Sequence, residues 1–404
     1  MNMNRKLIYN IVVSLTLIFL LCLQAACEPA DDDNETSTTT TTIISDTGWQ
    51  NVTDTLTIST PTGHDFAMHN GTLYLALCDH DNDLHATVMQ FDGGDWLSVG
   101  KAGFSDNRTQ MISITVDTVT GHPYVAFKKI YNYSLTDGHG SVMGYNGTYW
   151  YYLGDPAFTT HDVYLPVPAA LEGHVYLAYN RSIISGDYPF LVLFDRSTDD
   201  WTYRDESVLD DFELPYPDGL DLVYEDQTLY LAFRTTDKRA NVVAKSLGPT
   251  GMRILEVLGS PGFSTPAQSF TDLDVDEGTP YVAYVEESTG RVVVMRFDGA
   301  DWIELGDTGA VSIDTVALLV RNGIPYIVFT DTDRRLKVLA RRGDQWQSLD
   351  YEGLATNDIL QSNGPVLTAD TDNVYLCYLE RDTKATGSSH GTVRVVVKAY
   401  SLLQ

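Results

Sequence analysis

The sequence predicts an all-β fold built from seven repeats of one short strand motif. The motif reads Tyr, aliphatic, small, bulky apolar, and its copies begin 45 to 54 residues apart. A period of about 50 residues made of short strands is typical of a β-propeller, in which each repeat forms one four-stranded antiparallel blade. The copies are Tyr74-Leu-Ala-Leu77, Tyr124-Val-Ala-Phe127, Tyr176-Leu-Ala-Tyr179, Tyr230-Leu-Ala-Phe233, Tyr281-Val-Ala-Tyr284, Tyr326-Ile-Val-Phe329 and Tyr375-Leu-Cys-Tyr378.

The unit at residues 270–306 shows the composition of one blade most clearly. A segment that alternates around Leu273 and Val275 comes first, and the motif strand at Tyr281 follows it. The next two runs are Val292-Val-Val-Met-Arg-Phe297 and Trp302-Ile-Glu-Leu-Gly306. Gly and Asp residues separate the four β-type runs, so the unit reads as a four-stranded meander.

Tryptophans mark the last strand of most repeats, and they also predict how the ring closes. Trp49 lies in a last strand, residues 48–53, that has no repeat in front of it, whereas the seventh repeat ends at Gln404 before any Trp strand. We therefore expect residues 48–53 to complete the blade begun by residues 365–400, which removes two open sheet edges. The other tryptophans at this place are Trp96, Trp150, Trp201, Trp302 and Trp346, and Leu255 takes it in the fourth repeat.

Residues 1–26 resemble a bacterial lipoprotein signal peptide. Arg5 and Lys6 precede an apolar run, and the small residues Ala25 and Ala26 precede Cys27. The resemblance implies that Cys27 is the lipid-modified first residue of the mature chain, although Gln24 departs from the family's pattern. The alternative is an uncleaved membrane anchor of about 20 residues. Both alternatives place the following residues outside the cytoplasm, because the basic residues stay inside.

The remainder divides into a tether and one propeller domain. Residues 27–47 are acidic and Thr-rich without apolar periodicity, which predicts a disordered tether. Residues 48–404 form the propeller, since repeats that bury their faces on neighbours escape the size limit of a single core. We expect a monomer in the cell envelope, lipid-anchored at the bacterial outer membrane or the outer face of the plasma membrane.

The charge balance excludes two classes of partner. The chain has 26 basic and 55 acidic residues, a formal net charge of −29. Such a surface repels nucleic acid and anionic lipid headgroups, so membrane contact is expected only through the lipid anchor. The acidic surface either serves solubility or attracts cations such as Ca²⁺.

Two cysteines lie in the propeller, Cys78 in the first repeat and Cys377 in the seventh. Side-chain alternation places both on the face of their strands that carries the motif tyrosine, whereas a bridge between neighbouring blades needs opposite faces. We therefore expect two buried free thiols.

Motifs that carry chemistry are mostly missing. No Trp is followed by Asp as in WD40 repeats, and Ser197-Thr-Asp-Asp-Trp201 is only a partial sialidase Asp-box. A His-Glu-x-x-His zinc helix is absent from the sequence. The acids that an enzyme could use are scattered: Asp79, Asp237, Glu286, Glu287, Asp331 and Glu380.

One acidic segment fits a metal site. Asp79, Asp81 and Asp83 alternate between the second and third strands of the first blade, and their carboxylates could converge on Ca²⁺ if the loop curls. Leu84 stands where comparable loops have Gly. The alternative is a solvated acidic turn, and no other cofactor is predicted.

Candidate ligand-binding residues lie in the variable links. Links between first and second strands and between third and fourth strands are short, whereas the other two sets vary in length and share one face of an up-and-down blade. Binding residues concentrate on loops held by a rigid scaffold, and aromatic rings suit sugars or protein side chains. The candidates are Tyr131, Tyr133, His139, Tyr188, Tyr216 and His390.

The repeat itself supports a functional prediction. Its consensus, clearest from Gly278-Thr-Pro-Tyr to Trp302-Ile-Glu-Leu-Gly306, resembles that of exported bacterial propeller lipoproteins. The matching residues are structural, so the resemblance transfers no functional residue. We predict a lipid-anchored binding or scaffold protein with a protein or carbohydrate ligand. The alternative is a polysaccharide-acting enzyme, either a glycosidase or a lyase.

Overall fold

The computed structural model describes the repeat-containing part of the chain. Contacts divide the chain into Met1–Ile43 and Ile44–Gln404, and all described residues lie in the second part. The predicted signal, the tether and Cys27 therefore lie outside the described residues. Within the described part, no helix is long and apolar enough to cross a membrane. The described residues are 48–52, 56–91, 93–130, 138–159, 162–183, 186–195, 198–203, 220–246, 255–268, 272–349, 354, 359, 364–381 and 391–402.

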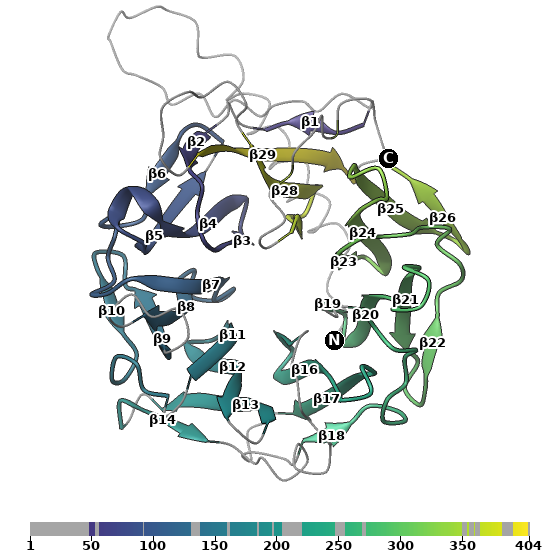
Figure 1. Cartoon of the computed structure of the whole chain (residues 1–404), viewed down its shortest axis with the longest axis horizontal. Coiled ribbons are helices and arrows are strands. Elements are labelled where there is room, and N and C mark those ends of the chain that lie inside the picture. Colours follow the sequence, from purple (N-terminus) through teal and green to yellow (C-terminus); the bar gives the residue numbers. More distant parts are fainter. Residues whose placement is uncertain are drawn as a thin grey trace, which may run out of the picture. The chain divides into compact units, whose positions relative to one another are not determined.

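Seven antiparallel sheets stand in a ring, each with its first strand next to the central axis (Figure 1). The predicted seven-bladed, four-stranded β-propeller is confirmed. Blade 1 consists of β3 (His64–His69), β4 (Thr72–Asp79), β5 (His85–Phe91) and β6 (Trp96–Ser98), blade 2 of β7 (Thr109–Val116), β8 (Pro123–Ile130), β9 (Gly138–Tyr145) and β10 (Trp150–Tyr152), and blade 3 of β11 (Asp162–Leu171), β12 (His174–Ile183), β13 (Gly186–Asp195) and β14 (Asp200–Tyr203).

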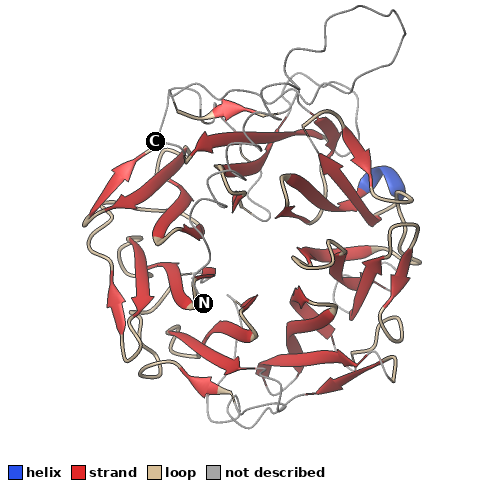
Figure 2. Cartoon of the chain, turned by 180° about the vertical axis from the view of Figure 1, so that it is seen from behind, coloured by secondary structure: helices blue, strands red, loops and turns tan. Residues whose placement is uncertain are grey.

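The next three blades repeat this order. Blade 4 consists of β15 (Asp221–Glu225), β16 (Thr228–Arg234), β17 (Ala240–Ser246) and β18 (Glu256–Val257), blade 5 of β19 (Asp272–Asp276), β20 (Thr279–Val285), β21 (Val292–Phe297) and β22 (Trp302–Glu304), and blade 6 of β23 (Val316–Arg321), β24 (Ile324–Thr330), β25 (Leu336–Arg342) and β26 (Gln345–Ser348). Seen from behind in Figure 2, the described chain has one helical turn, η1 (His80–Asn82), in the β4–β5 link.

Blade 7 closes the ring with both ends of the chain. It contains β27 (Val366–Ala369), β28 (Asn373–Arg381) and β29 (Thr392–Ser401), and its outer strand comes from the N-terminal side as β1 (Gln50–Asn51) and β2 (Leu56–Ser59). Gln50 pairs with Ala399, and Leu56 pairs with Val395. The predicted circular closure is therefore confirmed.

The motif strands are second strands that are buried on both faces, because each blade packs between two others. This explains why the motif is continuously apolar instead of alternating. The small residue at its third position, such as Ala126 or Ala283, is fully buried. Cys377 takes this place in blade 7, and Cys78 is also buried, so the predicted pair of buried free thiols is confirmed. Burial raises the pKa of the Cys78 thiol to about 11.

The tryptophans join the outer parts of neighbouring blades. The Trp302 indole stacks on Phe263 at 4.2 Å between ring centroids, and its Nε1 donates to the Leu258 carbonyl of blade 4 at 2.7 Å. Trp96 departs from this pattern, since its buried Nε1 has no hydrogen-bond partner among the described residues. The same bond to the preceding blade runs from Trp49 to Leu349, Trp150 to Val99, Trp201 to Leu153 and Trp346 to Leu305.

Carboxyl groups join the inner parts of neighbouring blades. The first strand of a blade pairs on one edge only, which leaves N–H groups on the edge beside the axis. Asp65 accepts the N–H of Phe66 at 2.8 Å and that of Ile114, in the next blade, at 2.9 Å. We call such groups inter-blade clasps. Further examples on first strands are Asp221 to Leu273, Asp272 to Leu318 and Asp274 to Val320, at 2.6 to 2.9 Å.

Truncating an outer tryptophan should destabilise the ring. We expect Trp302→Ala to lower the free energy of unfolding by about 3 to 5 kcal/mol, the range for large buried aromatic side chains. Chemical denaturation measures this change. Ile303→Ala is a matched control, because the Ile303 side chain on the next position of β22 is 43% exposed. Equal stability of the two variants would contradict a core role for Trp302.

The closing strand should be the most easily released outer strand. Trp49 is buried and stacks against Tyr400 at 5.5 Å between ring centroids, so Trp49→Ala removes the main anchor of a short strand. We expect faster proteolysis in residues 48–60 and faster hydrogen exchange at Val52, whose N–H donates to the Val397 carbonyl. Trp302→Ala serves as the control. Unchanged cleavage and exchange in Trp49→Ala would show that closure does not depend on this indole.

Candidate functional site

The links between second and third strands meet the inter-blade links on one face, which we call the loop face. The Ala267 N–H in an inter-blade link, for example, donates to the Lys238 carbonyl in the β16–β17 link at 2.8 Å. Near blade 2 this face carries ionisable and aromatic side chains from blade 2, from β11 of blade 3 and from the link before β7. We call this group the blade-2 cluster. It consists of Asp106, Lys128, Lys129, His139, Tyr152, Asp162 and Tyr164.

Lys128 forms the buried part of the cluster. Its side chain is fully buried at the end of β8, and its Nζ lies 2.6 Å from Asp162 Oδ1. The ammonium also lies 4.5 Å from the centroid of the Tyr164 ring. A buried cation is tolerated only when paired, so Lys128 and Asp162 hold each other in place. Asp162 keeps 13% of its side chain exposed, which leaves this pair open to the loop face.

Two glycines of β9 make room for these side chains. A Cβ on Gly138 would lie 2.6 Å from Lys128 Cε, and a Cβ on Gly140 would lie 2.9 Å from Thr159 Cγ2. The Gly138 N–H also donates to Asp162 Oδ1 at 2.9 Å. The Gly-x-Gly spacing around His139 is therefore required by space, and it fixes β9 against Lys128 and Thr159.

His139 is held in one orientation between these glycines. Its Nδ1 lies 2.5 Å from the Thr159 carbonyl oxygen. A carbonyl only accepts, so Nδ1 carries the hydrogen and the Nε2 of the neutral ring carries the lone pair. His139 is partly exposed on the loop face. A histidine with this tautomer is suited to accept a proton at Nε2.

Lys129 forms a second pair beside His139, which it opposes in the β8–β9 register. Lys129 Nζ lies 2.8 Å from Asp106 Oδ2, and the Tyr152 hydroxyl donates to Asp106 Oδ1. Burial acts to raise the pKa of Asp106, but hydrogen bonds from Lys129 and Tyr152 lower it below its usual range. The Asp106 side chain is 49% exposed, so this anion lies at the outer border of the cluster.

A bulge in β7 forms the border of the blade-2 cluster on the side of the central axis. The β7–β8 register shifts between Gln110 and Ser113, and Met111 adopts a φ of 54°. Such bulges re-aim side chains beside functional sites. Gln110 is paired with Lys128, and its buried Oε1 has no hydrogen-bond partner in the part of the chain that the structure describes.

His139 is the one predicted ligand residue whose side chain is described, and the structure places it in the cluster. Sequence reasoning missed Lys128, Asp162 and Tyr164, which lie in strands. A signal was available, because the position of Lys128 is apolar in the first, fifth and seventh repeats, at Cys78, Val285 and Leu379. The other candidates lie outside the described side chains: Tyr131, Tyr133, Tyr216 and His390 entirely, and Tyr188 with only its backbone described in β13.

The three predicted calcium ligands bind three different protein partners. Asp79 caps η1 and accepts from the Asp81 N–H, Asp81 accepts from the Ser59 hydroxyl at 2.7 Å, and Asp83 pairs with Arg108. Among the described residues no group of three ionisable side chains is arranged to hold a metal ion. The Ca²⁺ site stays a prediction, and the contact of Asp81 with β2 links this segment to the closing strand.

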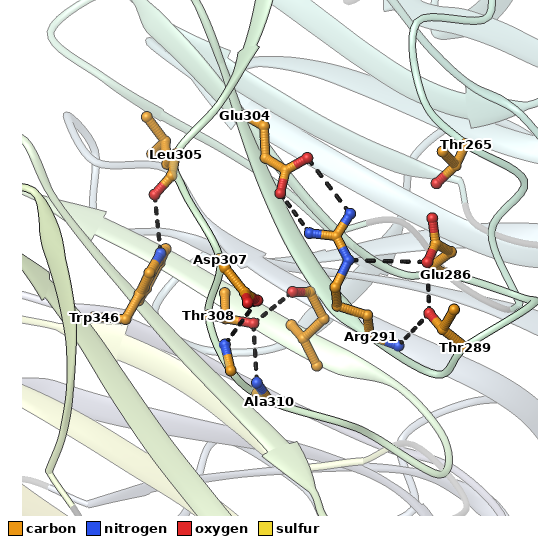
Figure 3. A network of polar contacts seen from close by, with 12 residues as sticks. Thr265, Glu286, Thr289, Arg291, Glu304, Leu305, Asp307, Thr308, Ala310 and Trp346 are labelled. Atoms are coloured by element: carbon orange, nitrogen blue, oxygen red, sulfur yellow. Dashed lines mark hydrogen bonds and ion pairs between the residues drawn. The ribbon is translucent and has the colours of Figure 1, made fainter.

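The scattered acids are engaged in local contacts. Figure 3 shows the densest example, in which Arg291 lies between Glu286 and Glu304 and the Thr289 hydroxyl donates to Glu286. A hydrogen bond from Thr289 lowers the pKa of Glu286. These groups are partly exposed, and surface pairs of this kind contribute little stability. The remaining contacts are Glu287 with Lys238, Glu380 with Arg394, Asp237 with Thr235, and Asp331 with the N–H of Asp333.

Comparisons with known proteins show the fold. No protein-family model and no curated protein matches the sequence. The polysaccharide lyase Uly1 is 11% identical, with a TM-score of 0.53 over 83% of this chain and 90% of that chain. A PL25 ulvan lyase bound to -[GlcA(1-4)Rha3S]- is 10% identical, with a TM-score of 0.50 over 87% and 96%. YjhT is 13% identical, with a TM-score of 0.50 over 72% and 97%. At these identities the likeness concerns the propeller alone.

The predicted Ca²⁺ site can be tested by measuring the free energy of unfolding with and without Ca²⁺. If Asp79, Asp81 and Asp83 bind Ca²⁺, a hundredfold excess over the dissociation constant adds about 2.7 kcal/mol to the free energy of unfolding. Asp81→Asn should reduce that gain. NaCl at matched ionic strength is the control, because screening of an acidic chain also stabilises it. Identical responses to the two salts, with no heat of Ca²⁺ binding, would leave the segment as a structural turn.

Proposed function

We propose that the protein is a polysaccharide-acting enzyme that cleaves an acidic polysaccharide by elimination on its loop face. The observation that carries the proposal is the blade-2 cluster, in which the buried Lys129 lies beside a histidine of defined tautomer and the buried Lys128 of the same strand lies against Tyr164. The solved propellers Uly1 and the PL25 ulvan lyase support the enzymatic alternative over the binding or scaffold prediction. The lipid anchor and the envelope location remain part of the proposal.

Electrostatics supports an acidic substrate at this place. The net charge of −29 repels a polyanion from most of the surface. Lys128 and Lys129 supply one cation on each face of β8, and their counter-ions Asp162 and Asp106 are partly exposed. A uronate carboxylate that takes the place of Asp106 beside Lys129 gains an ion pair where few water molecules compete.

Elimination needs a base beside a carboxylate-activated C–H bond and an acid at the leaving oxygen. In the proposed reaction His139 Nε2 takes the proton from C5 of the uronate, the C5–H electrons form the C4–C5 double bond, and the C4–O bond to the leaving sugar breaks. A tyrosine hydroxyl returns a proton to that oxygen, and Tyr164 is the candidate because its ring lies against Lys128. Lys128 acts as a positioning residue, since it is fully buried.

The reaction class is tested with a panel of uronate polysaccharides. We expect the full chain to produce an unsaturated uronate, seen as new ultraviolet absorbance, on at least one of them. His139→Gln and Tyr164→Phe should each lower kcat by about 100-fold or more, the range for loss of a general acid or base. His122→Gln on the opposite face is the matched control, because His122 follows the β7 strand in a short turn.

The outcome also decides between the two functional classes. Binding on a glycan array without any unsaturated product, in the wild type and in both variants alike, would contradict the enzyme and favour the binding protein. Wild-type turnover in His139→Gln would remove this histidine from the site.

A further inference from the structure

The seam between blades 5 and 6 is joined by a row of three carboxyl groups. Asp272, Asp274 and Asp276 occupy alternate positions of β19, so their side chains share the face toward blade 6. Each accepts a backbone N–H of blade 6 at the same short distance. The donors, in the same order, are Leu318, Val320 and Gly323, each at 2.6 Å.

A shared proton is required where this row meets blade 4. The two oxygens of Asp221 accept N–H groups of Leu222 and Leu273, at 2.8 and 2.9 Å. Asp221 is also hydrogen bonded to Asp272. Two carboxylates cannot form that bond without a hydrogen between them, so the pair shares one proton. Burial and the neighbouring Asp221 raise the pKa of Asp272 well above its usual range.

Among the described residues, the groups that face this row add negative charge and no cation. From β15, Asp221 and Glu225 place negative charge near Asp274. Asp221 also places negative charge near Asp65 of blade 1. From β20, Tyr281 lies opposite Asp274 in the register. The charged group of β23, Arg321, alternates onto the other face of its strand from Leu318 and Val320. Burial raises the pKa of Asp274 to about 7, and it does the same for Asp65.

We propose that the seam between blades 5 and 6 is a pH-dependent clasp, tight while Asp272 and Asp274 hold protons and loosened when both are charged. With a proton, each group still offers oxygen atoms to the N–H groups of β23 and does not repel its neighbours. Without protons, Asp221, Asp272 and Asp274 place like charges beside one another, with no counter-ion in the part of the chain that the structure describes. The least costly relief is then separation of β19 from β23.

Linkage fixes the direction of the effect. Asp274 has an ordinary pKa of 3.8, and it rises to about 7 in the folded protein. Between these values the folded chain holds a proton that the unfolded chain has released. Stability is therefore greatest at the acidic end of this window, falls as the pH rises toward about 7, and then levels off. Most proteins show the opposite trend, because their carboxylates are paired in the folded state.

The experiment is denaturant unfolding of the full chain at pH 5, 6, 7 and 8 at fixed ionic strength. We expect the wild-type midpoint to fall from pH 5 to pH 7 and Asp274→Asn to show a flatter profile. Asp117→Asn is the matched control, since Asp117 also clasps the next blade through the Gly173 N–H but has a lowered pKa, despite burial, because of its backbone hydrogen bonds. Its profile should keep the wild-type fall.

Hydrogen exchange in the wild type supplies a measurement that needs no variant. After correction for the intrinsic rate, protection at Leu318 and Val320 should fall by about tenfold or more between pH 5 and pH 7, as the release of one proton on opening requires. Ile114, clasped by Asp65, should follow the same trend, and Gly173 should not. A midpoint that rises from pH 5 to pH 7, equal profiles for wild type and Asp274→Asn, or unchanged protection at Val320 would each overturn the clasp.

Discussion

The ring depends on how one blade holds the next, because the backbone ladders of the described strands stay within their own sheets. Two kinds of hydrogen bond cross the seams between blades 1 and 2, blades 4 and 5, and blades 5 and 6. On the outside an indole, as in Trp302, donates to a carbonyl of the preceding blade. On the inside a carboxyl group, as in Asp65, accepts an N–H of the following blade. Between them the apolar faces of the second strands supply the buried area, and the polar bonds fix the register.

The difference between the outer indole bonds and the inner carboxyl bonds explains which parts of the fold could be predicted from the sequence. The motif strands, the tryptophan register and the closure by Trp49 follow from local patterns, because burial on both faces leaves a continuous apolar run and an outer strand leaves its Trp at a fixed distance. The inner clasps were not predicted, since Asp272 and Asp274 read as ordinary polar positions of an alternating strand. Their partners lie 46 residues further along the chain, and no local pattern marks them.

The candidate site was predictable only in part for the same reason. His139 was found because the sequence placed it in a link, although the structure places it in β9, and its orientation comes from Thr159 and the glycines around it. Lys128 and Asp162 belong to different blades, and only the ring brings them within 2.6 Å. The bulge at Met111 has no signal in a sequence that carries neither Gly nor Asn at that position. Fold could be predicted from periodicity, whereas the site follows from contacts that cross a seam.

Closure by the first strand of the described chain has a consequence for the order of folding. Gln50 leaves the ribosome long before Ala399, its partner in the sheet, so the last seam is one of the most non-local contacts of the chain. Contacts of this sequence separation are slow to form, because a long loop must be closed first. Until residues 366–401 have been synthesised, blade 7 lacks its three inner strands, and the outer strand at Gln50 has no strand to pair with. An unfinished ring is thus an open, aggregation-prone intermediate, and completion of the C-terminal strand converts it into the closed fold.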